Sequence, residues 1–233
     1  MNQLTLDFFS NPHPGFHKTV TIFDDVLVTD VPIVEIPIKL DTESILSDII
    51  TNGEFNPHVR PKFNFEKIDR ISNWHKAHLY QTEDIEQYRY CTNLSEKILG
   101  DEVLPAINVD QKMHRSFIDQ LDKIGLVLKW CHIMQLGPGG YLTPHRDLNS
   151  NQHPLNYFWI PLNWPEGSKL GVYPIGEVKI NLGSIYLLNQ KNYVHSVANF
   201  GNQNRYILNG MFKLPIDQKF SDLVRNNIKN QYQ

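Results

Sequence analysis

His145 and Asp147 lie two positions apart in the stretch "TPHRDLNSN" of this 233-residue chain. On an extended strand, residues at this spacing point to the same side, so an imidazole and a carboxylate would lie next to each other. Together these two groups suit a divalent metal ion. The pair alone is weak evidence, because such a polar stretch is also typical of a turn with an exposed histidine.

A third candidate ligand follows further along the chain. His195 lies in the strand-like run "YVHSVANF", and Arg205 opens the next such run, "RYILNGMF". Two histidines and one carboxylate on one face of a metal ion leave other coordination positions open, an arrangement that suits Fe(II) in oxygenases. Arg205 would then bind an anion, because its planar guanidinium pairs with a carboxylate through two hydrogen bonds. The sequence therefore predicts a metal site together with an anion site.

Short β-rich runs dominate the chain after Gly125 and must position these residues. They include "LVLKWCHIMQL", "LNYFWIPL", "GSIYLLN" and "RYILNGMFKL", separated by Gly, Pro and Asn turns. Several strands at such regular spacing predict a sandwich or small barrel, with enough residues over 126–215 for a jelly roll. We expect a C-terminal helix or tail over 216–233.

Residues 1–125 are expected to pack on this core as strands and helices. The start of this segment is rich in Val, Ile and Thr and favours extended structure, while "DTESILSDIITNG" predicts a helix over 41–53. Residues 57–80 are expected to form an irregular surface segment. Apolar spacings of three and four predict helices over 82–125, with Gly125 as C-cap. The fold class is therefore α+β, in a single domain with an N-terminal helical elaboration.

The composition is that of an ordinary globular protein. Hydrophobic residues make up 41%, charged residues 20%, and the net charge is −3. We therefore expect no nucleic acid and no membrane as partner, and nothing in the sequence indicates an oligomeric state. Without a membrane-length apolar run, a secretory leader or a disulfide framework, a cytoplasmic protein is expected. Its two cysteines are interpreted as buried thiols or as residues without a role.

The combined motifs of residues 130–214 resemble the Fe(II)/2-oxoglutarate-dependent dioxygenases. The closest pattern is that of the aspartyl/asparaginyl/prolyl hydroxylase group, with a Pro-Gly turn before Pro-His-x-Asp and a His-x-Val-x-Asn before Arg. The matching residues are Pro138-Gly139, Pro144-His145-Arg146-Asp147, and His195-Ser196-Val197-Ala198-Asn199 with Arg205. The resemblance implies a double-stranded β-helix (jelly roll, cupin-like). It also implies Fe(II) on His145, Asp147 and His195, and the 5-carboxylate of 2-oxoglutarate on Arg205.

The resemblance further implies a hydroxylase. Such an enzyme uses Fe(II), 2-oxoglutarate and O₂ to hydroxylate a C–H bond and releases succinate and CO₂. Asp147 favours hydroxylation, because halogenating relatives leave the carboxylate position empty for halide. The substrate would be a small molecule or a peptide: a free amino acid, or an Asp, Asn or Pro residue.

One strand departs from the group's pattern. Members often carry an Arg and a His that approach the cosubstrate or substrate, where "NYFWIPL" has Tyr157 and Trp159. We expect these two residues at the cosubstrate site, with Tyr157 as a hydrogen-bond donor; packing as a core aromatic is the other interpretation.

Two other functions stay open. One is a cupin-type protein that binds a metal or small ligand without turnover, and the other is a degenerate oxygenase that serves as a binding protein. Arg205 discriminates between oxygenase and cupin, because a cupin needs no anchor for 2-oxoglutarate.

Overall fold

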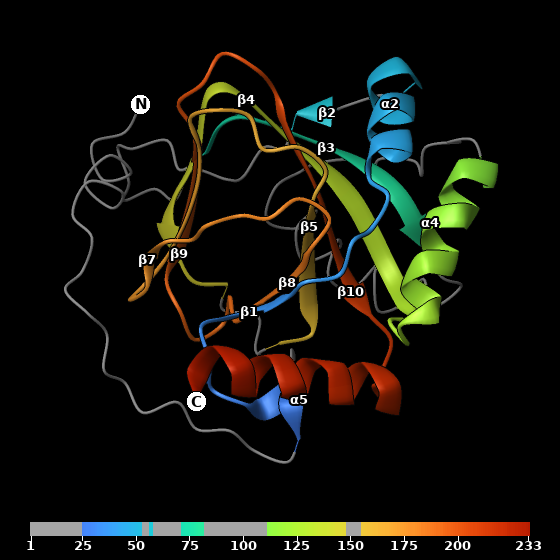
Figure 1. The fold of residues 1–233 in the computed structure, drawn as a ribbon. Coiled ribbons are helices and arrows are strands. Elements are labelled where there is room, and N and C mark those ends of the chain that lie inside the picture. The colour runs from blue at the N-terminus through green and yellow to red at the C-terminus, as the bar shows by residue number, and fades with distance from the viewer. Residues whose placement is uncertain (1–24, 53–55, 58–70, 82–110, 148–154) are drawn as a thin grey trace, which may run out of the picture.

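The computed structural model describes residues 25–52, 56–57, 71–81, 111–147 and 155–233 (Figure 1). The helical elements in these residues are the 3-10 helix η1 (Val26–Val28), α2 (Glu43–Asn52), α4 (Gln111–Lys123) and α5 (Gln218–Tyr232). The strands are β1 (Ile33–Ile36), β2 (Asn56–Pro57), β3 (Ile71–Gln81), β4 (Leu128–His145), β5 (Tyr157–Pro161), β6 (Ser168–Val172), β7 (Gly176–Glu177), β8 (Ile185–Leu188), β9 (His195–Asn199) and β10 (Arg205–Phe212). None of the helices in these ranges is both long and apolar enough to span a membrane.

The long strand β4 takes part in two antiparallel sheets. Its first half pairs with β10 up to Leu136, and its second half pairs with β9 from Tyr141 to His145. The major sheet has the order β1-β8-β5-β10-β4, and the minor sheet has the order β4-β9-β6-β7. β3 pairs with β4 along both halves and with the short β2 on its other side. Successive segments thus alternate largely between two sheets, which is the predicted jelly-roll arrangement of a double-stranded β-helix. The fold-class prediction is confirmed.

The motif residues Pro138 and Gly139 lie where β4 changes sheet. The ladder with β10 ends just before them and the ladder with β9 begins just after them. Gly139 has a φ of 69°, a left-handed conformation that glycine adopts without a side-chain clash. The Pro-Gly turn is therefore the bend that carries His145 from the major to the minor sheet.

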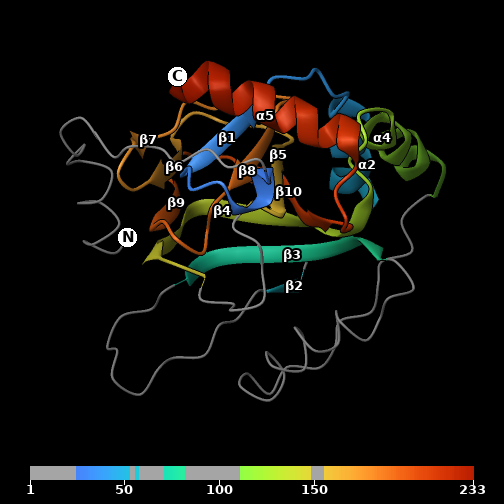
Figure 2. The same cartoon turned by 90° about the horizontal axis from the view of Figure 1, so that it is seen from below.

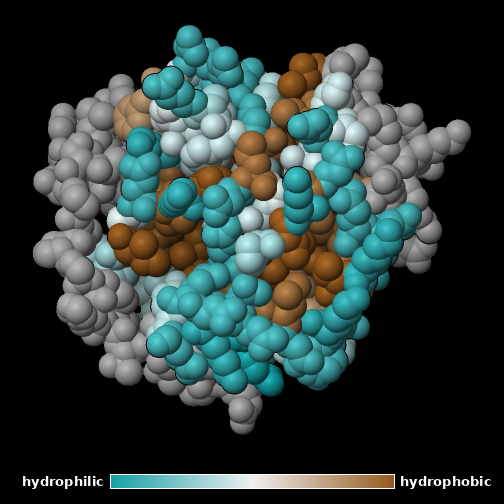
Figure 3. All heavy atoms as spheres, in the orientation of Figure 1, coloured by the Kyte–Doolittle hydropathy of each residue, from teal (hydrophilic) through white to brown (hydrophobic). Residues whose placement is uncertain are grey.

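The major sheet separates two apolar clusters, because side chains alternate along each strand. The helix-side core contains Phe158 and Leu208 of the sheet and Phe220 of α5. The inner core, on the other face, contains Ile207 and is completed by Val197 of the minor sheet. Figure 2 shows α2, α4 and α5 together on the side of the molecule away from β3. On the face seen in Figure 3, hydrophobic residues gather in two patches bordered by hydrophilic ones.

The N-terminal predictions have mixed outcomes. The helix over 41–53 is confirmed as α2, and α4 confirms helix at the end of 82–125, with Gly125 at a φ of 81° just beyond it. Residues 82–110 lie outside the described residues. The irregular segment predicted over 57–80 is wrong at Pro57, which ends β2, and from Ile71 onward, where β3 begins; residues 58–70 lie outside the described residues. Its sequence "ISNWHKAHLYQ" mixes polar and aromatic residues, and pairing with β4 rather than an apolar pattern defines this strand.

Cys131 is a buried free thiol, as one of the two interpretations of the cysteines predicted. Burial raises the pKa of this thiol to about 12, so it stays protonated and unreactive at neutral pH. Cys91 lies outside the described residues.

Candidate metal centre

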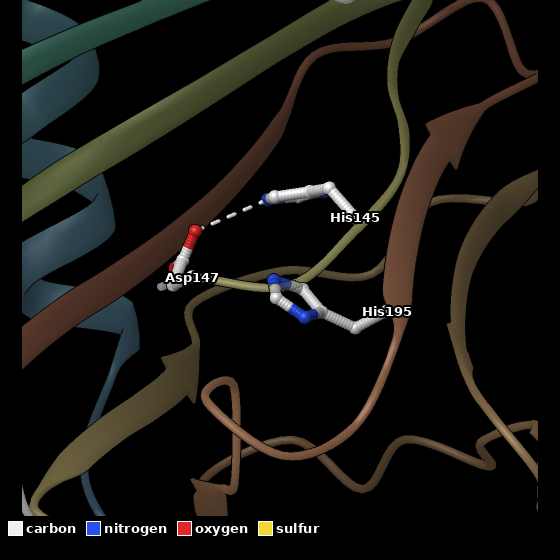
Figure 4. A group of neighbouring side chains, drawn as sticks. All are labelled: His145, Asp147 and His195. Atoms are coloured by element: carbon white, nitrogen blue, oxygen red, sulfur yellow. Dashed lines mark ion pairs between the residues drawn. The ribbon is translucent and has the colours of Figure 1, made fainter. Parts of the chain in front are cut away.

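Three potential ligands meet at the end of β4 and the start of β9 (Figure 4). His145 ends β4, Asp147 follows just beyond, and His195 opens β9 as the direct register partner of His145. Their ligand atoms all lie within 4.8 Å of one another, which no other group of three or more His, Cys, Asp or Glu achieves in the described ranges. Antiparallel pairing thus brings together residues that are far apart in the sequence.

Hydrogen bonds to the backbone fix both imidazoles. Nδ1 of His145 lies 2.7 Å from the carbonyl oxygen of Thr143, and Nδ1 of His195 lies 3.3 Å from that of Tyr193. Because a carbonyl oxygen only accepts, each Nδ1 carries the proton and donates it, and each Nε2 keeps its lone pair. Histidine ligands of metals are commonly oriented by such contacts.

Nε2 of His145 and Oδ1 of Asp147 face each other at the candidate centre. Nε2 of His145 is buried and makes no hydrogen bond with the described residues, and Oδ1 of Asp147 lies 3.4 Å from it (Figure 4). Two lone-pair atoms at this distance repel each other unless a proton or a metal ion lies between them. Two imidazoles and one carboxylate suit a borderline divalent ion such as Fe(II), so the residues fit the metal that the motif implied.

Arg205 is fully buried at the start of β10. Its Nη1 donates to the carbonyl oxygen of Lys169 at 3.3 Å, and its guanidinium carbon lies 5.0 Å from the centroid of the Trp164 ring. Nε and Nη2 have no hydrogen-bond partner among the described groups. Burial lowers the pKa of this guanidinium to about 9, because the charged form loses its hydration. A buried cation with two unused donor nitrogens is a binding site for an anion.

The two candidate sites lie on the same pair of sheets at a defined spacing. Lys169, whose carbonyl accepts from Arg205, pairs with Ala198, and Ala198 is three residues along β9 from His195. At about 3.3 Å per residue, this spacing corresponds to roughly 10 Å. Arg205 and Ile207 of the inner core lie on the same face of β10, because they are two residues apart.

Asn199, the last residue of the His-x-Val-x-Asn motif, holds the loop that precedes Arg205. Its Nδ2 donates to the carbonyl oxygens of Leu136 at 2.9 Å and Gln203 at 2.7 Å, and its Oδ1 accepts from the N–H of Gly201 at 3.1 Å. Leu136 is the register partner of Arg205 in β4. The motif residue therefore fixes where β10 begins, a role that the sequence pattern did not reveal.

The turn formed by Pro165, Glu166 and Gly167 supports the same loop. A Cβ on Gly201 would lie 2.1 Å from the carbonyl oxygen of Glu166, so only glycine allows the two backbones to approach this closely. The N–H of Phe200 donates to the carbonyl oxygen of Gly167 at 2.8 Å. Both turns therefore brace the start of β10.

Trp159 lies beside the candidate metal centre. It is buried, and its ring lies edge-on to His195, with centroids 6.5 Å apart and an interplanar angle of 80°. Tyr157 is half-buried two positions earlier in β5, on the same face of the strand. Sequence reasoning missed Gln190, a buried residue of the β8–β9 turn whose carbonyl oxygen accepts from the N–H of Asp147 at 2.9 Å. A glutamine in a turn carries no local signal of such a contact.

No protein-family model and no curated protein matches the chain. Among solved structures it is similar to a prolyl-4-hydroxylase from Pseudomonas putida (18% identity, TM-score 0.42, 74% of this chain and 85% of that chain covered). It is also similar to an oxidoreductase of the 2OG-Fe(II) oxygenase family from Burkholderia pseudomallei (14% identity, TM-score 0.45, 82% of this chain and 89% of that chain covered). A third similar structure is a predicted oxalate decarboxylase from Thermotoga maritima (14% identity, TM-score 0.31, 60% of this chain and 81% of that chain covered). At these identities and TM-scores the reaction has to be argued from the site itself.

Proposed function

We propose that the protein is an Fe(II)- and 2-oxoglutarate-dependent oxygenase. It would hydroxylate a C–H bond of an amino acid, or of an Asp, Asn or Pro residue in a peptide, with release of succinate and CO₂. The observation that carries the proposal is the combination of a three-ligand centre with a buried Arg205 whose Nε and Nη2 have no hydrogen-bond partner among the described residues. A cupin that only holds a metal has no need of that second, costly group.

The ligand residues would hold Fe(II) through Nε2 of His145, Nε2 of His195 and Oδ1 of Asp147. Bound there, Fe(II) supplies the O₂ chemistry that amino-acid side chains lack. The protein's own contribution to the reaction would be the arrangement of the ligands. Three ligands leave coordination positions open for the cosubstrate and O₂, and the Nδ1 hydrogen bonds keep both imidazoles in the ligating orientation.

Arg205 would bind and orient 2-oxoglutarate by its far carboxylate. The roughly 10 Å of strand between His195 and Ala198, the register partner of Lys169 whose carbonyl accepts from Arg205, suits a short dicarboxylate with one end at the metal and the other at the guanidinium. Because Arg205 is shielded from water, its pairing with a carboxylate is stronger than on the surface. Tyr157 and Trp159 would border the metal end of the cosubstrate.

The test is anaerobic titration with Fe(II) and then 2-oxoglutarate, followed by the absorbance of the iron–2-oxoglutarate charge-transfer band. Wild type should develop the band. Asp147→Ala should lose Fe(II) binding because a ligand is removed. Arg205→Ala should keep Fe(II) binding but require a few hundredfold to a few thousandfold more 2-oxoglutarate, which corresponds to the roughly 3–5 kcal/mol lost when one partner of a buried pair is removed. Arg205→Lys should restore only part of the affinity, since an ammonium lacks the bidentate fork.

Two residues of α5 provide matched controls. Arg225→Ala removes a guanidinium as Arg205→Ala does, and Asp222→Ala removes a carboxylate as Asp147→Ala does. Both residues belong to α5 and to neither candidate site, so both variants should titrate as wild type. A wild type without the band, or an Arg205→Ala variant that titrates as wild type, would favour the metal-binding cupin instead. With the band established, succinate release from a panel of amino acids and peptides identifies the substrate.

A further inference from the structure

The side chain of Gln190 lies between Asp147 and Trp159. In one orientation its Nε2 donates to Oδ2 of Asp147 at 3.1 Å, and its Oε1 accepts from the indole Nε1–H of Trp159 at 3.0 Å. The reverse orientation would set the amide oxygen against a carboxylate and the NH₂ against an N–H donor. Hydrogen bonding therefore selects the first orientation.

The turn that carries Gln190 is itself fixed by backbone hydrogen bonds. The N–H of Gln190 donates to the carbonyl oxygen of Leu188 at 2.9 Å, and that of Tyr193 donates to the carbonyl oxygen of Asn189 at 3.1 Å. Oδ1 of Asn189 accepts from the N–H of Asn192 at 3.1 Å. Gln190 is only 6% exposed. A buried amide on a braced turn can fix the groups that it contacts.

We propose that Gln190 is a positioning residue that makes Asp147 a monodentate ligand, an inference that rests on the proposed metal centre. The two carboxylate oxygens have different surroundings. Oδ2 accepts from Gln190, whereas Oδ1 lies 3.4 Å from Nε2 of His145. With Oδ2 engaged, Asp147 offers a single oxygen to the metal, which keeps one more coordination position open.

The same amide determines what Trp159 does. The indole N–H is the only hydrogen-bonding group of tryptophan, and Gln190 accepts it. Trp159 therefore contributes its ring beside His195 rather than a hydrogen bond to a cosubstrate carboxylate. Gln190 links Trp159 of β5 to Asp147, which lies two residues beyond the end of β4. Trp159 therefore acts on the metal centre through Gln190.

Three substitutions separate these contacts. Gln190→Met keeps the size of the side chain and removes both hydrogen bonds. Gln190→Glu keeps the acceptor for Trp159 but replaces the donor to Asp147 with a second carboxylate. Trp159→Phe removes the indole N–H and keeps a smaller aromatic ring beside His195. Gln135→Met is the control, because Gln135 is a half-buried glutamine of β4 whose amide bonds to the Tyr206 hydroxyl at 3.3 Å.

The readouts are anaerobic dissociation constants for Fe(II) and Co(II) and the d–d absorbance of the Co(II) protein. Gln190→Met should weaken metal binding by about 10–100-fold, the usual range for groups that orient a ligand, and should change the Co(II) spectrum. Gln190→Glu should also change the spectrum. Trp159→Phe should lose less affinity, and adding it to Gln190→Met should cost nothing more. Gln135→Met should match wild type.

The outcomes distinguish the two proposals. If wild type binds neither metal, the proposed metal centre fails. If wild type binds but Gln190→Met and Gln190→Glu show its affinity and spectrum, the metal centre stands and the role of Gln190 is overturned. Circular dichroism of each variant shows whether it is folded, and an unfolded Gln190→Met leaves Gln190→Glu to decide.

Discussion

The two faces of the major sheet are built from the same strands but differ in chemistry. On the helix side, Phe158, Leu208 and Phe220 are completely buried among other apolar side chains. On the inner side, Arg205 and Asn209 lie on the same face of β10, and both carry buried polar atoms that have no hydrogen-bond partner within the part of the chain that the structure describes. Alternation along a strand allows one segment to supply both faces.

The two faces contribute to the free energy of folding with opposite signs. Burying apolar area stabilises a fold by roughly 25 cal/mol per Å². A buried polar atom without a partner costs about 1–3 kcal/mol, and a charged one costs more. The free energy gained in the helix-side core therefore offsets the cost of the buried polar atoms on the inner face. Substitutions on the two faces should have effects of opposite sign.

The largest effect on stability is expected on the helix side. Phe220 is fully buried in α5, with its ring 5.4 Å from that of Phe212. Phe220→Ala should lower the free energy of unfolding by about 3–5 kcal/mol, measured by urea denaturation. Fe(II) affinity of the folded variant should not change. Phe200→Ala is the control, because its 39% exposed ring should contribute within about 0.5 kcal/mol. Weaker Fe(II) binding by folded Phe220→Ala would show that the two faces are coupled.

The opposite sign is expected at Arg205. Arg205→Met replaces a desolvated cation by an apolar side chain of similar length. Without ligand, this variant should be more stable than wild type by about 1–4 kcal/mol. With metal already bound, adding 2-oxoglutarate should raise the melting temperature of wild type but not of the variant. A less stable ligand-free Arg205→Met would mean that the charge is compensated within the protein.

The stability difference between Arg205→Met and wild type should depend on pH. Burial lowers the pKa of Arg205 to about 9, below its ordinary value of 12.5. The unfolded chain therefore holds this proton more tightly, and the cost of the buried charge is complete below pH 9 and declines as the pH rises above it. The stability advantage of Arg205→Met should be constant between pH 7 and 8 and smaller at pH 10. An advantage that grows with pH would contradict this assignment.

Residue types explain why part of the site could be predicted from the sequence. Histidine and aspartate stand out in strand-like runs, and a spacing of two places His145 and Asp147 on one face of a strand. The motif therefore identified a triad, with His195, that the fold brings together. Gln190 could not be found in this way. Its contacts with Asp147 and Trp159 exist only after β5, the end of β4 and the β8–β9 turn have come together.

The same reasoning applies to the strands. The β-rich runs between Gly, Pro and Asn turns identified β5, β8 and β10, whose two faces meet two cores. They did not identify β3, because its mixed polar and aromatic residues form no such run and its pairing with β4 and β2 defines it. Local sequence thus predicts elements that define a core and fails for an element that a neighbour defines.

Asn199 provides the smallest and most specific test, because it belongs to the minor sheet yet supports the strand of Arg205. Asn199→Ala removes three hydrogen bonds, to Leu136, Gln203 and Gly201. At a net 0.5–1.5 kcal/mol each, the three bonds predict a loss of about 1.5–4.5 kcal/mol of unfolding free energy. Fe(II) affinity should stay close to wild type, whereas 2-oxoglutarate binding should weaken, because the start of β10 is no longer fixed.

The matched control for Asn199→Ala is Asn204→Ala, which removes one amide contact with the Tyr206 hydroxyl from the same loop. It should lose less than half as much stability and bind 2-oxoglutarate as wild type does. Parallel thermal melts and anaerobic titrations of both variants measure the two effects separately. If Asn199→Ala weakened Fe(II) binding and left 2-oxoglutarate binding intact, Asn199 would support the His195 end of β9 rather than Arg205. The division between a stabilising face and a binding face would then have to include the minor sheet as part of the metal centre.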